Sequence, residues 1–135
     1  MKELTLAATL ENIEAVTDFV NGALEAIDCP MKAQMQIDIA IDELFSNVAR
    51  YAYAPDTGDV TVRVESSNDP PAVIITFVDK GVPYNPLDKE DPDTTLSAED
   101  RQIGGLGIYM VKKSMDDISY EYKNGQNIVS IVKRL

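Results

Sequence analysis

Two polar side chains one helical turn apart are the first candidates for chemistry. Glu43 and Asn47 stand four residues apart in a segment with helical periodicity, so the two side chains share one helix face. A carboxylate can accept a proton from an attacking hydroxyl group, and a carboxamide oxygen can ligate Mg²⁺. Solvated helix faces carry the same residue types. The spacing alone leaves both a metal-assisted site and an ordinary wet surface open.

A second candidate follows the most apolar segment of the chain. Residues 72–78 are nearly all apolar and mostly β-branched, which predicts a buried central strand, and Asp79-x-Gly81 comes at its end. An aspartate there can accept a hydrogen bond from an exocyclic amine, and glycine lets a flat ring approach the backbone. These are the two needs of an adenine pocket. Asp-x-Gly at the end of a strand is also a common turn.

The third candidate is a glycine-rich helix start at residues 104–107. Gly105 and Gly107 allow successive backbone amides to face outward, and the helix dipole adds partial positive charge, which together suit a phosphate chain. The motif lacks the lysine-serine/threonine ending of a Walker A loop, and no strand immediately precedes it as in the dinucleotide fingerprint. Close packing of the glycines against a neighbouring element is the alternative interpretation.

The elements that must position these residues follow from hydrophobic periodicity. Asn124-Gly125 predicts a tight hairpin turn, and Thr9 is predicted to cap the N-terminus of the first helix. Residues 66–71 are expected to turn the chain, and residues 80–103 are expected to form a long loop. The predicted elements are a strand at 2–8, helices at 10–27 and 31–52, strands at 60–65 and 72–78, a helix at 104–115, and a hairpin from 118 to 135. This order favours a two-layer α/β sandwich, with three helices on one face of a mixed, mainly antiparallel sheet.

Composition narrows the function classes. The chain has 135 residues, which fits one domain, with 12 Lys and Arg against 23 Asp and Glu, a net charge of −11. Such a charge disfavours nucleic acids and anionic membranes as partners. Histidine is missing and Cys29 is the single cysteine, which excludes histidine-dependent nucleophilic catalysis and histidine or cysteine zinc sites. With no visible secretory signal or membrane span, we expect a cytoplasmic protein.

Taken together, the three motifs resemble those of the GHKL ATPase superfamily, which has the Bergerat ATP-binding fold. Within it, the sequence looks like the small bacterial anti-sigma-factor serine kinases. Residues 42–53 resemble the N box of that family, residues 79–86 its first glycine box, and residues 104–111 its second. The resemblance covers nearly the whole chain and implies one ATP-binding domain over 1–135.

The resemblance also implies a role for each motif residue. Glu43 would be the general base, and Asn47 would ligate the Mg²⁺ that bridges the phosphates. Asp79 would accept a hydrogen bond from the adenine amine, and Gly81 would line the ring. Gly105 and Gly107 would offer amides to the phosphates, and a lid over ATP would run from about 86 to 103.

The function implied is phosphorylation of a serine on an antagonist protein of the STAS type by an ATP-dependent homodimer that also binds a sigma factor. A non-catalytic, nucleotide-gated binding module is the alternative, and a plain acidic scaffold would require all three motifs to be accidental. The chain departs from the family at Tyr51, where relatives commonly carry histidine. It departs again at Asn127 and Ile128, where a threonine is common.

Overall fold

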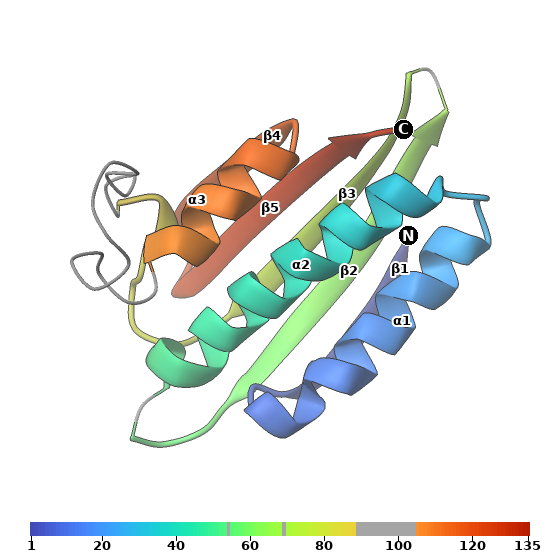
Figure 1. The fold of residues 1–135 in the computed structure, drawn as a ribbon. Coiled ribbons are helices and arrows are strands. Elements are labelled where there is room, and N and C mark those ends of the chain that lie inside the picture. The colour runs from blue at the N-terminus through green and yellow to red at the C-terminus, as the bar shows by residue number, and fades with distance from the viewer. Residues whose placement is uncertain (54, 69, 89–104) are drawn as a thin grey trace.

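In the part that the structure describes, the chain folds into two layers, a five-stranded sheet and three α-helices that cover one of its faces (Figure 1). This computed structural model describes residues 1–53, 55–68, 70–88 and 105–135. The strands are β1 (Lys2–Ala7), β2 (Asp59–Asn68), β3 (Pro71–Asp79), β4 (Asp117–Lys123) and β5 (Gln126–Arg134). The helices are α1 (Ile13–Glu25), α2 (Met31–Asn47) and α3 (Gly105–Ser114), and the predicted two-layer α/β sandwich is confirmed.

The strand order of the sheet is β1-β2-β3-β5-β4, and every pairing between the described strands is antiparallel. The mixed sheet expected from the sequence is therefore antiparallel throughout its described part. Val60, Val62 and Val64 of β2 are buried and alternate with more exposed residues, as one covered sheet face requires. Strands β2 and β3 continue to Asn68 and from Pro71, so the turn is shorter than the predicted 66–71.

The register of the central strands places two polar residues side by side. Asp79, the last residue of β3, pairs with Asn127 of β5. Because side chains alternate along a strand, Asp79 faces the same side as Phe77, and Asn127 the same side as Val129. Both apolar neighbours are buried in the core beneath the helices. Asp79 and Asn127 therefore meet on the helix-covered face, at the end of the sheet where α2 finishes.

The hairpin between β4 and β5 is confirmed at the predicted turn. Lys123 pairs with Gln126, so the loop contains two residues, and these are Asn124 with φ 54° and Gly125 with φ 77°. Positive φ at both central positions matches the twist of the flanking strands, and Asn-Gly is the pair that adopts it most readily. The turn thereby fixes which residues of β5 face the core.

The first helix begins later than its apolar pattern suggests. Residues 10–12 form a short 3₁₀ turn, and α1 starts at Ile13. The predicted N-cap is wrong, because the Thr9 side chain makes no capping hydrogen bond. Asn12 Nδ2 instead donates to the Ala7 carbonyl at 2.8 Å, tying the start of the helix to the end of β1.

The second helix changes from α-helical to π-helical winding at its C-terminal end. Regular α-helix ends at Asn47, and Val48–Ala52 form a π-helical turn, whereas the sequence predicts one α-helix to residue 52. Apolar residues continue across this junction, so periodicity gives no sign of it. The Ala52 carbonyl accepts a hydrogen bond from Val82 N at 2.8 Å, which joins the turn to the loop after β3.

Within the described residues, no helix is long and apolar enough to cross a membrane.

Candidate nucleotide-binding site

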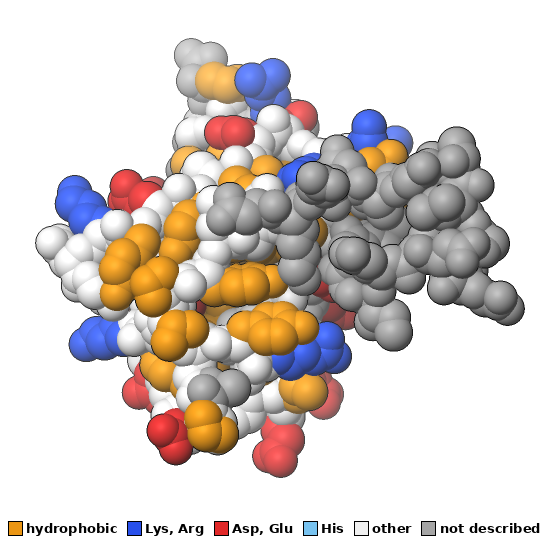
Figure 2. Space-filling model, turned by 90° about the vertical axis from the view of Figure 1, so that its left-hand side faces the viewer, with side chains coloured by type: hydrophobic (Ala, Val, Ile, Leu, Met, Phe, Trp, Pro, Cys, Tyr) orange, Lys and Arg blue, Asp and Glu red, His pale blue; other side chains and the backbone are white. Residues whose placement is uncertain are grey.

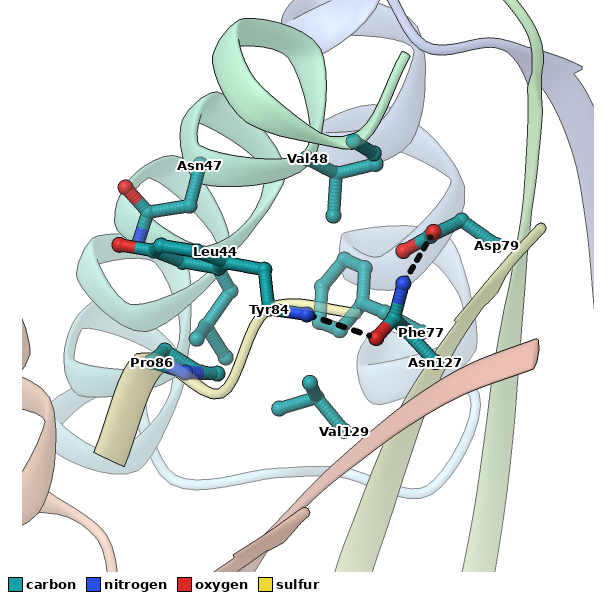
Figure 3. Close-up of a pocket in the computed structure, with 10 residues that line it drawn as sticks. Leu44, Asn47, Val48, Phe77, Asp79, Tyr84, Pro86, Asn127 and Val129 are labelled. Carbon is teal, nitrogen blue, oxygen red and sulfur yellow. Dashed lines mark hydrogen bonds between the residues drawn. The ribbon is translucent and has the colours of Figure 1, made fainter. Parts of the chain in front are cut away.

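A pocket lies where the end of α2 meets the ends of β3 and β5 (Figure 3). Three polar residues, Asn47, Asp79 and Asn127, line it, and they are the buried polar or charged residues of the described part of the chain. A mostly apolar pocket with a few convergent polar groups is the usual form of a small-molecule site. The apolar part of the lining consists of Leu44, Val48, Ala52, Phe77, Tyr84, Pro86 and Val129.

Asp79 is held at the floor of this pocket with 5% of its surface exposed. Its Oδ1 accepts two hydrogen bonds of 2.9 Å, one from Gly81 N and one from Asn127 Nδ2. Burial raises the pKa of the Asp79 carboxyl group, because the charged form loses solvation, and the two hydrogen bonds act in the opposite direction. The site therefore contains a desolvated carboxylate supported on one oxygen.

Asn47 lines the same pocket from α2, and its side-chain amide nitrogen has no hydrogen-bond partner among the described residues. The residue is 6% exposed, and its Nδ2 is buried. Leaving a buried polar atom unpaired costs roughly 1–3 kcal/mol, so such an atom calls for an explanation. A ligand that contacts the Asn47 amide would supply one, and an amide oxygen is a suitable donor for a hard cation.

Glu43 lies one turn earlier on α2 and outside the pocket lining. Its carboxylate packs against the Cα of Gly107 in the first turn of α3, because a Cβ built at Gly107 would overlap the carboxylate. Gly107 is therefore a glycine for a steric reason, and it brings the start of α3 to the acidic side chain of α2. Gly105 is the first residue of that helix.

Gly81 also makes a close backbone approach. A Cβ at this position would overlap the carbonyl group of Ala52 in the π-helical turn. Gly81 N donates to Asp79, yet Gly81 is not among the residues that line the pocket. The structure thus places Gly81 behind Asp79, where it allows the loop after β3 to pack on the end of α2.

The structure brings the predicted residues to one end of the molecule in two groups. Asn47 and Asp79 face the pocket, while Glu43 and Gly107 contact each other beside it. Figure 2 shows hydrophobic side chains gathered on this end of the molecule. Of the predicted lid at 86–103, the structure describes Pro86–Asp88 as a 3₁₀ turn, and the remainder, like Gly104, lies outside the described residues.

Sequence reasoning missed the part that Asn127 plays in this pocket. It noted Asn127 only as a departure from a family pattern. The available signal was its place in β5, two residues before Val129 and four before Ile131, since alternation puts all three on one face. A polar residue in such an inward row either pairs with another buried group or serves a site.

The family that matches this chain is a family of ATPase domains. The chain belongs to the family described as the histidine kinase-like ATPase domain, which it matches over residues 6–133. The resemblance to GHKL ATPases, and within them to anti-sigma serine kinases as distant homologues, is thereby confirmed.

Named relatives are serine or serine/threonine kinases. The chain is 32% identical over 131 residues to the serine-protein kinase RsbW of Bacillus cereus (strain B4264), covering 94% of this chain and 81% of the relative. It is 22% identical over 100 residues to the serine/threonine-protein kinase BtrW of Bordetella bronchiseptica, covering 74% and 70% of the two chains.

A solved structure of the RsbU and RsbW domains of Rv1364c from Mycobacterium tuberculosis matches the fold. The TM-score is 0.68 at 17% identity, and the match covers 100% of this chain and 33% of that longer chain. At this identity the match supports the architecture alone.

Proposed function

We propose that the chain is an ATP-binding protein serine kinase of the anti-sigma type, organised as one domain over residues 1–135. The observation that carries the proposal is the convergence of Asn47, Asp79 and Asn127, the buried polar residues of the described chain, on one apolar pocket. In a family of ATPase domains, such a pocket suits a purine base with polar groups at its edge.

The adenine base and the phosphate chain of ATP would each contact a different part of the site. Asp79 would accept a hydrogen bond from the adenine amine, and Gly81 would hold the Asp79 carboxylate from behind through its N–H. Gly105 and Gly107 stand in the first turn of α3, where backbone amides and the helix dipole favour phosphate. A lid over about 86–103 would cover the nucleotide.

The residues of α2 suit metal-assisted phosphoryl transfer. Asn47 Oδ1 would ligate Mg²⁺, whose charge would neutralise phosphate when bound, and the unpaired Nδ2 would be free to donate to a ligand oxygen. Glu43 would accept the proton of a serine hydroxyl as its oxygen bonds to the γ-phosphorus. The bond from that phosphorus to the bridging oxygen breaks, and ADP leaves with the electron pair.

The partners proposed are a STAS-type antagonist that carries the target serine, a sigma factor, and a second copy of the chain in a homodimer. Similarity to serine-protein kinases of the RsbW type supports this choice of partner class. The acidic character of the chain, with net charge −11, agrees with protein partners rather than nucleic acid.

The test combines binding with transfer. ATP with Mg²⁺ should raise the melting temperature, because a ligand that binds the folded state stabilises it by mass action. Labelled ATP, incubated with the protein and STAS proteins of the same organism, should then transfer label to a serine. Absence of any thermal shift at millimolar ATP would overturn the nucleotide site. Binding without transfer to any STAS protein would favour the nucleotide-gated binding module instead.

A further inference from the structure

Asn127 uses both ends of its side-chain amide within the protein. Its Nδ2 donates to Asp79 Oδ1 at 2.9 Å and to the Val82 carbonyl at 2.8 Å, with the Gly81 carbonyl at 3.4 Å. Its Oδ1 accepts from Tyr84 N at 3.1 Å and from the Tyr120 hydroxyl group. An amide has two donor hydrogens and two acceptor lone pairs, so the full capacity of Asn127 is in use. Turning the amide over would break every one of these bonds.

The arrangement makes the two oxygens of Asp79 unequal. Oδ1 accepts hydrogen bonds from Gly81 N and Asn127 Nδ2, whereas Oδ2 accepts none from the described residues. In Figure 3, Asn127 binds the carboxylate from the strand β5 side, at the edge of the pocket. The free hydrogen-bonding capacity of this buried carboxylate is therefore concentrated on Oδ2.

We propose that Asn127 is a positioning residue that engages Asp79 Oδ1, reserves Oδ2 as the acceptor of the pocket, and so makes binding selective for a base with an amino group at that point. Asn127 acts through Asp79 and does not itself touch the base. The inference rests on the proposed nucleotide function and deepens it. It assigns base selectivity to a residue of β5 that lies outside the motifs at Glu43–Asn47, Asp79–Gly81 and Gly105–Gly107.

Electrostatics supports the same assignment. Burial raises the pKa of Asp79, and the hydrogen bond from Asn127 opposes that rise. Without the bond, a larger fraction of Asp79 would be protonated. A protonated carboxyl group can donate a hydrogen bond, so it would match an oxo group in place of an amino group. Loss of Asn127 should consequently change which base is preferred, beyond any general loosening of the pocket.

The test compares ATP with purine riboside triphosphate, which lacks the 6-amino group, using calorimetry. Asn127→Ala should weaken ATP about tenfold, the scale for losing a hydrogen bond to a charged group, and weaken the analogue less than about twofold. Asn127→Thr, which offers one hydroxyl donor, should fall between. Ile131→Val, a buried apolar change on the same strand, is the control and should leave the ratio of the two affinities unchanged.

Equal weakening of both ligands in Asn127→Ala would show a purely structural role and overturn the inference. If that variant does not fold, the Asn127→Thr ratio decides. In the unmodified protein, the Asn127 side-chain NH₂ resonances should also shift more with ATP than with the analogue, and equal shifts would contradict the proposal. Failure of the unmodified protein to bind either triphosphate would instead refute the nucleotide function, and this inference with it.

Discussion

At the scale of single residues, Asn47 and Glu43 share a helix but face different surroundings. Asn47 is buried in the pocket lining, whereas the carboxylate of Glu43 lies beside the pocket against Gly107. Two side chains in separate environments can contribute to separate steps. Binding and chemistry should therefore respond differently to changes at the two positions.

Glu43→Gln should leave ATP affinity nearly unchanged and reduce phosphoryl transfer roughly 100-fold or more, the usual scale for a lost general base. The substitution keeps the size of the side chain and removes most of its basicity. Calorimetry measures the affinity, and label transfer to the STAS partner measures the rate. Transfer at the unmodified rate would remove Glu43 from the mechanism.

Asn47→Ala is the companion variant. It should weaken binding of ATP in the presence of Mg²⁺ and slow transfer together, because the amide would contact the ligand before and during the reaction. ATP affinity equal to that of the unmodified protein would contradict the role proposed for Asn47.

Gly107→Ala should disturb the site through Glu43. The added methyl group would overlap the carboxylate, so either α3 or Glu43 must move. We expect slower label transfer and weaker ATP binding. Gly22→Ala is the matched control, since a Cβ there meets nothing within 4 Å and alanine favours a helix interior by up to about 1 kcal/mol. Gly22→Ala should raise the melting temperature and leave transfer unchanged; equal activity in both variants would refute the steric argument.

At the scale of elements, the contact between α1 and α2 contains a polar pair whose hydrogen-bonding capacity is only partly used. Asn21 Nδ2 donates to Asp38 Oδ2 at 3.5 Å, and two oxygens, Asn21 Oδ1 and Asp38 Oδ1, are buried without a partner in the described structure. Burial raises the pKa of Asp38, the hydrogen bond from Asn21 lowers it, and the nearby charge of Asp42 raises it further. Ionised Asp38 therefore opposes the packing of the two helices.

Asp38→Asn should consequently stabilise the fold at neutral pH. The folded state holds the Asp38 proton more tightly than the unfolded state, so the unfolding free energy of the unmodified protein falls as pH rises from the ordinary pKa near 3.8 through the raised folded value. The gain from the substitution should grow over that window and then stay constant. Urea unfolding at several pH values measures it. Asp42→Asn should give a smaller gain of the same sign, and a gain independent of pH would contradict the assignment.

Local chemistry made some elements predictable, and tertiary contacts decided the rest. The Asn124-Gly125 hairpin follows from two residues that tolerate positive φ, and β2 follows from its alternating valines. The π-helical turn at 48–52 left no trace in the pattern, because its hydrogen bonding depends on contacts such as that between Ala52 and Val82. Asp79 was predictable from its strand, whereas its pairing with Asn127 required the register between β3 and β5.

At the scale of the whole molecule, the charge of the chain opposes its proposed ligand. The net charge is −11, and ATP is itself a polyanion. The long-range field of the protein should slow the approach of ATP when salt is low, since the Debye length is about 30 Å at 0.01 M and about 8 Å at 0.15 M ionic strength.

The association rate constant of ATP should therefore rise with added salt at fixed Mg²⁺, by severalfold between those two ionic strengths. Stopped-flow mixing with a fluorescent ATP analogue measures the rate. Uncharged adenosine is the control, and its association rate should not depend on salt. A rate for ATP that falls with salt would mean that local cations outweigh the overall field.

The π-helical turn at Val48–Ala52 has a bearing on how chains of this kind change in length during evolution. A π turn and an α turn differ by a single residue, so gaining or losing one amino acid here converts one winding into the other without interrupting the helix. Most one-residue insertions inside a helix rotate everything that follows by about 100°. At this junction the extra residue is absorbed locally, ahead of the loop that leads to β2. We expect ancestral or related sequences that lack the π turn to be one residue shorter at this point and otherwise to keep the same alignment.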